Sequence, residues 1–473
     1  MNFPTLFSKP HILIIAGGIL LALFSVIDAA LAIGALLAVF LCSLALFCIG
    51  TIKEKETVRF LSILFSVVFL LHVALVLFVY YANFQPFSDG RGDYTEYHFV
   101  AQEIANRVPA GNFSFEGLPL THYYPVAIGY LYAATIPSML MGQLLNAWIV
   151  ALIAVFACLI VIQIGRSRRE GFLVGILAGL YPSLAFYGSL LLKDALVVLL
   201  GTIALLLTFK IIKKFSWPQF IIFYLVLAGT GHLRFYISYA LILNFIICWL
   251  FLSDFKIKKR VAYGVIMIIL LGLLPRFSTL DGATQGYFGG GSVSYYLNTQ
   301  TITGYRNLAN PENVQKEEPQ AMPEAPAPVP PVVSEEPVFQ DSAVIVETGF
   351  KDPVSFLKNI SLSFIYSSLG PFPWQLTQKR HLFVLPEMIL WYVLLFFIAR
   401  GIITSIKKEY RVILPLLIFS GIVFGVLSVY INNFGIVTRI RMPAFLALLC
   451  LLPFGLEKFK NTKIPFLEKY LHL

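Results

Sequence analysis

Residues 58–82, VRFLSILFSVVFLLHVALVLFVYYA, form an apolar run whose one formally charged side chain is Arg59. About 20 such residues are enough for a helix to cross the hydrocarbon core of a bilayer. Residues 88–107, SDGRGDYTEYHFVAQEIANR, follow almost directly and carry six charged residues. The two segments together predict a membrane-spanning helix that delivers a charged segment to the membrane surface.

The composition of the whole chain agrees with this pattern. Hydrophobic residues make up 58% of the 473 residues and charged residues only 13%, and the mean hydropathy is +0.81. These values lie far outside those of soluble domains and indicate an integral membrane protein. The net charge of +10 does not by itself indicate a nucleic-acid partner, because the Lys and Arg residues mostly cluster between apolar runs.

Length and hydropathy predict an all-α polytopic membrane protein with about twelve transmembrane helices. The three longest apolar runs are divided at Asp28, at Lys193–Asp194 and at Arg234, because 40 apolar residues would form one helix of about 60 Å, twice the hydrocarbon thickness. The predicted spans are residues 11–27, 29–50, 58–82, 142–164, 171–190, 195–212, 217–232, 236–253, 261–276, 383–403, 411–430 and 440–457.

The basic clusters predict the orientation of these spans, since short cytoplasmic loops carry an excess of Lys and Arg. Under the twelve-span arrangement every cluster falls on the same side, so both termini are expected to be cytoplasmic. The expected location is the bacterial cytoplasmic (inner) membrane. The clusters lie at residues 53–59, 166–169, 210–214, 256–260, 407–411 and 458–463.

Four regions follow from this arrangement, and the third contains a linker. Residues 311–337 hold eight prolines and six glutamates, and such a segment buries too little surface to fold, so we expect an extended linker there. The regions are an extra N-terminal helical hairpin (1–57), a transmembrane core (58–276) with a first outer loop (83–141), an outer periplasmic region (277–382), and C-terminal helices with a cytoplasmic tail (383–473).

The charged segment is predicted to form a short amphipathic helix over residues 93–107, lying along the outer surface. Asp89, Arg91 and Asp93 would lie at its N-terminal turn, at the lip of the membrane. Asp93 could instead do no more than cap the helix, a role that Asp often has. The apolar residues spaced by three or four that predict this helix are Tyr94, Tyr97, Val100, Ala101, Ile104 and Val108.

The pattern Asp93-x-x-x-Tyr97-x-x-x-Ala101 stands just after a transmembrane helix and is followed by HYYPVAIGYLYAATIPSMLMGQLLNAWIVAL and YPSLAFYGSLLLKDALVVLL. Over residues 60–260 this arrangement resembles the GT-C superfamily of membrane glycosyltransferases. The resemblance implies a polyprenyl-phosphate-linked sugar donor, a catalytic carboxylate at Asp93 and a second acidic position at Asp194. Two extra N-terminal helices and the proline-rich insertion depart from the minimal pattern of the superfamily.

The chemistry of sugar transfer assigns roles to further residues. A carboxylate such as Asp93 can accept the proton of the acceptor hydroxyl, and arginines can receive the charge that develops on the lipid phosphate. No Gly-rich phosphate loop is present, which favours a lipid-linked donor over a nucleotide sugar. The residues predicted to bind substrate are Asp89, Arg91, Tyr97, His122, Tyr124, Lys193, Asp194, Arg234, Arg439 and Arg441.

Each of these assignments has a simpler alternative. Lys193 and Asp194 could pair with each other at a turn, Arg439 and Arg441 could extend to lipid headgroups, and residues 122–124 could be interfacial aromatic residues. A divalent cation, Mg²⁺ or Mn²⁺, could bridge a phosphate at the outer face. No residues have the spacing of metal ligands, so no metal site is predicted.

The predicted function is therefore transfer of a hexosyl or pentosyl group from a polyprenyl-phosphate donor to a glycan, lipid or protein acceptor at the outer face. One alternative is a polysaccharide polymerase or ligase of the envelope, which would be expected to concentrate its function in a large late outer loop. A transporter or flippase of lipid-linked sugars is the other alternative, and it would need charged groups near the bilayer midplane.

Overall fold

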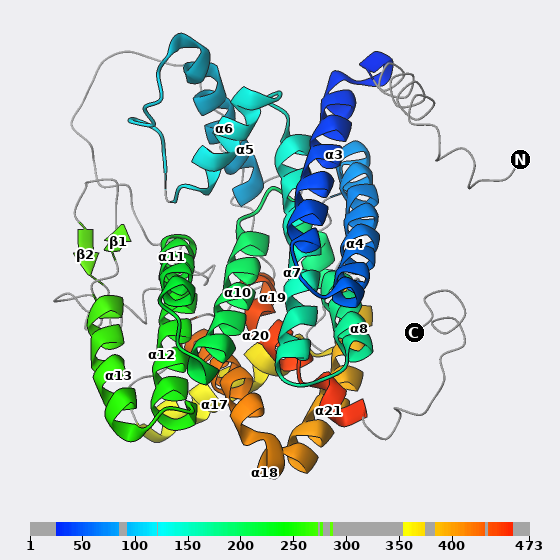
Figure 1. Cartoon of the computed structure of the whole chain (residues 1–473). Helices are drawn as coiled ribbons and strands as arrows, with labels where there is room; N and C mark the ends of the chain where they lie inside the picture. Colours follow the sequence, from blue (N-terminus) through cyan, green and yellow to red (C-terminus); the bar gives the residue numbers. More distant parts are fainter. Residues whose placement is uncertain are drawn as a thin grey trace, which may run out of the picture.

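The computed structural model describes residues 25–84, 92–120, 122–272, 275–277, 284–286, 353–373, 384–430 and 434–456. This part of the chain is helical apart from two antiparallel three-residue strands. Six of its helices are long and apolar enough to cross a bilayer, or seven if one bent helix pair counts as a single span. The protein is therefore a membrane-embedded helical bundle (Figure 1).

The elements keep the labels of Figure 1. In chain order they are α3 (Ala29–Gly50), α4 (Lys55–Ala82), α5 (Asp93–Arg107), the 3₁₀ turn η1 (Val108–Ala110), α6 (Tyr124–Ala134), α7 (Met139–Gln163), α8 (Arg168–Gly179), α9 (Pro182–Gly188), α10 (Asp194–Lys213), α11 (Trp217–Leu233), α12 (Phe235–Leu252), α13 (Ile257–Gly272), β1 (Pro275–Phe277), β2 (Thr284–Gly286), α17 (Pro353–Leu369), α18 (Leu385–Tyr430), α19 (Phe434–Ile440), α20 (Met442–Leu449) and α21 (Leu452–Leu456).

The three predicted divisions of long apolar runs are confirmed. Asp28 is the N-cap of α3, and its Oδ1 accepts a hydrogen bond from the backbone N–H of Ala30 at 2.8 Å. Lys193 and Asp194 stand at the start of α10. Arg234 separates α11 from α12 with an extended backbone (φ −150°, ψ 85°). In each case a charged side chain marks the point where the helix breaks.

The predicted pair of spans at 383–403 and 411–430 forms the single element α18 with a break inside it. Glu409 leaves the helical conformation (φ −122°, ψ 29°) and divides α18 into two arms. Since 46 residues of straight helix would be about 70 Å long, this break allows the two arms to fold back within one bilayer. The basic residues around 407–411 surround the break, as the orientation prediction expects.

The number of twelve spans stays a prediction. α11 has 17 residues and α13 has 16, fewer than the roughly 20 that a spanning helix needs. α8 and α9 are bent by 56° to each other. Most of the first predicted span, the linker at 311–337 and the basic cluster at 458–463 lie outside the described residues.

The basic clusters of the described chain meet at one end of the bundle. Arg168, the first residue of α8, forms ion pairs with Glu54, the N-cap of α4, and with Glu56 in its first turn. Arg166, between α7 and α8, pairs with Glu409 at the break of α18 (3.0 Å). These contacts place three of the predicted cytoplasmic loops side by side.

Two further contacts bring the remaining described clusters to the same end. Arg411, beside the break of α18, forms an ion pair with Asp254 between α12 and α13. The backbone N–H of Asp254 also donates to the carbonyl of Ile212 in the last turn of α10, at 3.2 Å. The predicted alternation of the basic clusters is therefore matched by the packing. We call this the basic end of the bundle.

α5 and α6 form a small layer at the opposite end (Figure 1). The predicted amphipathic helix is present with its predicted bounds, and its apolar face is buried against α6. Gly129 permits this contact, because a Cβ there would lie 2.7 Å from Cβ of Ile104. The layer thus places the first residue of α5, Asp93, against the end of the bundle.

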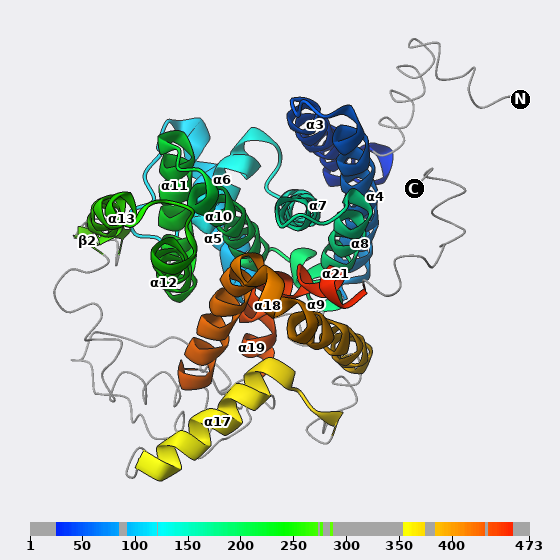
Figure 2. The ribbon, with the colours of Figure 1, turned by 60° about the horizontal axis from the view of Figure 1, so that its bottom comes forward.

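α7 and α10 form the interior of the bundle. They are buried over most of their length and lie among the other helices in Figure 2. α17 packs on α18. Its Ser367 lies within 3.4 Å of Ser428 near the end of α18, and Trp391 near the start of α18 donates to the carbonyl of Ser368. The C-terminal end of α17 therefore lies at the end of the bundle opposite the break at Glu409.

Candidate functional site

A buried carboxylate held by two arginines is the centre of the candidate site. Asp194 is the first residue of α10, and its side chain is only 7% exposed. Its Oδ1 accepts from Nη2 of Arg234 at 2.7 Å. Its Oδ2 accepts from Nε and Nη2 of Arg439 at 3.1 and 2.8 Å. Both carboxylate oxygens are therefore paired, as the burial of a charge requires.

Arg439 also connects this buried centre to the surface. Its Nη2 donates to Oδ2 of Asp93 at 2.8 Å, and the Asp93 side chain is 47% exposed. Gly92 is the N-cap of α5, so Asp93 is the first helical residue, a position where the helix dipole favours an acidic side chain. The result is a continuous chain of ion pairs, Asp93–Arg439–Asp194–Arg234, which we call the acid–arginine chain.

The sequence predicted all four members of the acid–arginine chain but not the pairs they form. Asp93 begins α5, Asp194 begins α10, Arg234 ends α11, and Arg439 lies in α19. These elements are separated by up to 346 residues. The alternative in which Asp194 pairs with its neighbour Lys193 does not describe the structure, because the ion pairs of Asp194 are with Arg234 and Arg439. Residues adjacent on a helix do not face each other.

Lys193 adds a further amine beside the acid–arginine chain. Its burial, reinforced by the positive charges of Arg234 and Arg439, lowers its pKa to about 7, although Asp194 and Asp93 oppose the shift. No hydrogen bond or ion pair of its side chain forms within the described part of the chain. An amine with this pKa changes charge near neutral pH and would favour an anion placed next to it.

The lowered pKa of Lys193 predicts how stability depends on pH. Between about pH 7 and the unperturbed value near 10.4, the unfolded chain binds a proton at Lys193 that the folded chain does not. Stability should therefore rise with pH across this window. We expect the melting temperature of the wild type to rise relative to that of Lys193→Met from pH 6 to pH 9. Thermal unfolding in detergent would measure this difference.

The matched control is Lys214→Met, which removes an exposed lysine at the basic end. Its melting temperature should stay at a constant offset from the wild type over the same pH range. A constant offset for Lys193→Met as well would contradict the shifted pKa.

Aromatic and histidine side chains hold the α5–α6 layer together and join it to the bundle. The Tyr97 hydroxyl lies 2.9 Å from Nε2 of His122, and both side chains are buried. Burial, then the charge of Lys193, lowers the pKa of His122 to about 3, so its ring is neutral. Burial together with the charge of Asp93 raises the pKa of Tyr97 above its usual value, which keeps the hydroxyl protonated.

Two more contacts complete this attachment. The Tyr124 hydroxyl donates to Oδ1 of Asn146 in α7 at 3.0 Å. The backbone N–H of Tyr123 donates to Nε2 of His232 at 2.9 Å, and the two rings stack with their centroids 4.4 Å apart. His122 and Tyr124 are each at most 4% exposed. They therefore lie inside the junction of the layer and the bundle rather than on an exposed belt.

Arg441 lies apart from the acid–arginine chain. Its side chain is fully buried, and its Nη1 donates to the carbonyls of Ser367 and Gly370 at the end of α17. Its Nη2 lies 3.9 Å from Oε1 of Glu387. Arg439 and Arg441, which the sequence assigned to one phosphate, are thus brought to different places. The guanidinium of Arg441 has no exposed surface with which to meet a lipid headgroup.

Glu387, His232 and Asn146 are not among the residues predicted from the sequence. Glu387 is 4% exposed and accepts from the hydroxyl of Ser183 in α9. Glu387 could have been predicted from its position inside an apolar run, because a carboxylate in a membrane segment is costly and is usually paired with a cation. Asn146, within α7, binds the carbonyls of Leu190 and Leu192 through its amide nitrogen at 2.7 and 2.9 Å, and so braces the turn before Lys193.

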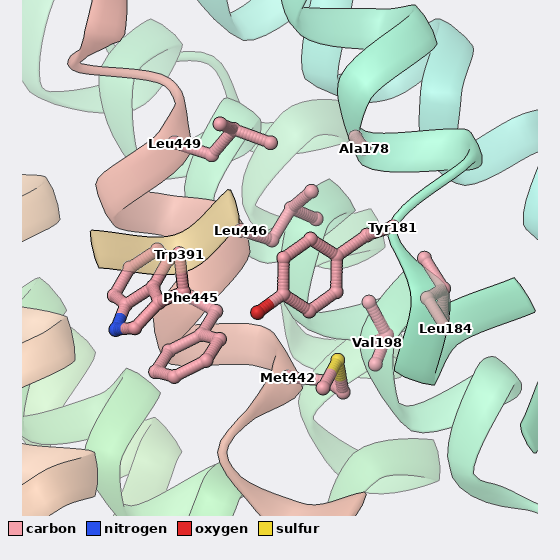
Figure 3. A pocket seen from close by; sticks show the side chains of 9 residues that line it. All are labelled: Ala178, Tyr181, Leu184, Val198, Trp391, Met442, Phe445, Leu446 and Leu449. Atoms are coloured by element: carbon pink, nitrogen blue, oxygen red, sulfur yellow. The ribbon is translucent and has the colours of Figure 1, made fainter. Parts of the chain in front are cut away.

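A small apolar cavity of about 20 Å³ lies near Arg441. In Figure 3 the Tyr181 side chain projects into this region, and its hydroxyl points toward Phe445. Trp391 stacks on Phe445 with ring centroids 3.8 Å apart. A cavity of this size has room for about one water molecule, so it is too small for a sugar or a lipid chain.

Among the described residues no three His, Cys, Asp or Glu side chains are grouped as metal ligands. Asp89 and Arg91, two predicted substrate-binding residues, lie outside the described residues. No model of a known protein family matches the chain, and no curated protein sequence matches it.

Proposed function

We propose that this chain is a membrane glycosyltransferase of the GT-C type. It would move a hexosyl or pentosyl group from a polyprenyl-phosphate donor to a glycan, lipid or protein acceptor. The observation that carries the proposal is the acid–arginine chain, in which a half-exposed carboxylate, Asp93, shares Arg439 with the buried Asp194. A half-exposed carboxylate and a guanidinium thus lie side by side at one end of a membrane protein, as a proton acceptor and a phosphate-binding cation would need to.

The proposed reaction uses Asp93 as the general base. The carboxylate accepts the proton of the acceptor hydroxyl while the acceptor oxygen bonds to the anomeric carbon of the sugar. The bond between that carbon and the phosphate oxygen breaks, and its electron pair stays on the oxygen. The products are the glycosylated acceptor and the polyprenyl phosphate. Arg439 orients Asp93 before the reaction, because its Nη2 donates to Oδ2 of that carboxylate at 2.8 Å.

The leaving phosphate needs cations that the carboxylates have not already neutralised. Asp93 and Asp194 together balance Arg234 and Arg439. Nε and Nη2 of Arg439 are occupied, whereas its Nη1 forms no hydrogen bond with the described residues. We assign Nη1 of Arg439 and the amine of Lys193 to the phosphate, since guanidinium and ammonium groups both stabilise phosphate charge. Lys193 would gain a proton as the phosphate binds.

The site is proposed to face the periplasm. This orientation is supported by the position of the acid–arginine chain at the end of the bundle opposite the basic end. The positive-inside rule assigns the basic end to the cytoplasm. The proposed location is the bacterial cytoplasmic membrane, with twelve spans, an outer loop at 83–141 and both termini inside. A polyprenyl-phosphate sugar would then react at the outer face.

Two alternatives remain for comparison. A polysaccharide polymerase or ligase would also use outer arginines, and it shares the lipid-linked donor class. A transporter or flippase is less favoured, because the charged groups of the described chain gather at helix ends. Glu387 is the third residue of α18, and Arg441 lies between α19 and α20. Neither stands in the middle of a long span.

The deciding experiment is transfer of a radiolabelled sugar from a polyprenyl-phosphate donor by the purified protein in detergent. We expect label to leave the donor and free polyprenyl phosphate to form. Protein that moves the intact donor between leaflets of a proteoliposome without cleaving it would be a flippase. Donor that is neither cleaved nor moved, with membrane glycolipid extracts offered as acceptors, would refute the proposal.

The same assay can test the sidedness. A short-chain, water-soluble donor should be consumed by sealed right-side-out vesicles and spared by sealed inverted vesicles. The opposite result would place the acid–arginine chain at the cytoplasmic face.

A further inference from the structure

A groove of about 700 Å³ lies at the basic end, far from the acid–arginine chain. It is formed by the start of α4, the end of α7 and the start of α8. The proposed transferase reaction makes no use of it. Its lining combines charged and apolar side chains, which is the combination that an amphiphilic ligand requires.

The charges of the groove favour an anion. Four arginines and two glutamates line it, which leaves two net positive charges. Arg168 is paired with both glutamates. Arg166 is paired with Glu409 and lies over the ring of Phe454, 3.8 Å from its centroid. These two arginines are occupied by the protein itself.

The other two arginines are available. Arg59 of α4 and Arg169 of α8 are both exposed, and neither forms an ion pair or hydrogen bond within the described part of the chain. They come from two different helices that line the same groove. Two such guanidiniums can each form paired hydrogen bonds with phosphate oxygens.

The remaining wall of the groove is apolar. Phe60 and Phe172 meet edge to face with centroids 6.2 Å apart, which joins α4 to α8, and Ile63 lies one turn beyond Arg59. The N-terminus of α8 is already capped, because Ser167 and Glu170 satisfy each other's backbone N–H groups. The groove therefore depends on its side chains and not on a free helix end.

The position of the groove along α4 indicates the source of the anion. α4 is one of the helices long and apolar enough to span the membrane, and it begins at Lys55. Arg59 is thus one turn inside the span, at the depth of lipid headgroups, while Phe60 and Ile63 lie where acyl chains begin. Basic pockets between helices at the cytoplasmic surface suit anionic lipid headgroups.

We infer that this groove binds an anionic glycerophospholipid of the cytoplasmic leaflet. Arg59 and Arg169 hold the phosphodiester, and one acyl chain lies along Phe60 and Ile63. This inference is independent of the proposed transferase activity, because it concerns the other end of the molecule.

The test compares binding of phosphatidylglycerol and phosphatidylcholine to the full chain in detergent. Lipid adducts in native mass spectra and the lipid-dependent rise in melting temperature both report binding. We expect the wild type to prefer phosphatidylglycerol, and Arg59→Gln/Arg169→Gln to bind it about 30-fold more weakly. Each basic group near anionic headgroups is worth roughly a factor of five in affinity, and the two factors multiply.

Lys210→Gln/Lys213→Gln is the matched control, because it removes two exposed charges at the same end but outside the groove. It should weaken binding by no more than about three-fold, since the distant charges are screened. If both double variants bind phosphatidylglycerol equally weakly, the lipid is held by general electrostatic attraction to the basic end and not by the groove, and the inference is overturned. Equal binding of phosphatidylcholine by the wild type would also overturn it. Displacement of phosphatidylglycerol by millimolar inorganic phosphate would identify a free anion as the ligand instead.

Discussion

Asp93→Asn should lower the rate of sugar transfer by a factor on the order of 100 or more, the usual effect of removing a general base. Asn keeps the size of the side chain, and Gly92, not Asp93, is the N-cap of α5, so no capping bond is lost, but Asn cannot accept the proton of the acceptor. The rate is measured with radiolabelled donor under saturating conditions, so that a change in turnover is separated from a change in donor affinity.

Folding should hardly change in this variant. The Asp93 side chain is 47% exposed, and exposed ion pairs contribute little to stability. Asp194 would still pair with Arg439 and Arg234. The melting temperature of Asp93→Asn should therefore stay close to that of the wild type, which distinguishes a catalytic carboxylate from a structural one.

Two neighbouring acidic residues serve as controls. Glu96→Gln removes an exposed charge one turn along α5 and should leave turnover near the wild-type rate. Asp89→Asn should reduce turnover less than Asp93→Asn does. Its main effect should be a weaker affinity for the donor. Wild-type turnover in Asp93→Asn combined with an inactive Asp89→Asn would identify Asp89 as the base. If both variants are fully active, the proposed mechanism is wrong.

The helices of this fold can be predicted from sequence because membrane insertion imposes a length and an apolar composition on each of them. The break at Arg234 was predictable because a charged residue interrupts an apolar run too long for one span. The helix from Asp93 to Arg107 was predictable because its apolar residues recur every three or four positions. All of those that lie within α5 are buried in the structure.

The pairing of the charged residues could not be predicted in the same way. Asp194 and Arg234 meet only because the turns before α10 and α12 lie at the same end of the bundle. Hydropathy places both at that end but does not say which cation meets which acid. The buried pair of Arg441 and Glu387 is not predictable from hydropathy, because Glu387 is a single acidic residue inside the apolar run 383–403 and the sequence does not show which cation meets it.

The separation of Arg439 from Arg441 has a simple geometric reason. Residues two positions apart on a helix project about 200° apart, so they do not face the same ligand. Here α19 ends at Ile440, immediately before Arg441, and the two side chains contact different helices. This geometry changes what is expected of their substitutions.

Arg439→Gln should lower turnover by about 100-fold to 1,000-fold, the usual effect of removing a donor that stabilises charge in the transition state. The variant loses both the cation that orients Asp93 and the guanidinium proposed to receive the phosphate. Arg439→Lys should recover only part of the rate, because an ammonium lacks the planar fork that binds two carboxylates and a phosphate together. Turnover and donor affinity are measured for each variant in the same transfer assay.

Arg441→Gln gives the contrasting result that makes this test specific. Arg441 is fully buried against Glu387, and removal of one partner of a buried ion pair typically costs about 3–5 kcal/mol of stability. Its melting temperature should therefore fall well below that of Arg439→Gln, in which Asp194 keeps its bond to Arg234. An Arg439→Gln protein with wild-type turnover would remove Arg439 from the mechanism. If the Arg441→Gln protein keeps its melting temperature and loses turnover, the lipid phosphate would be assigned to Arg441.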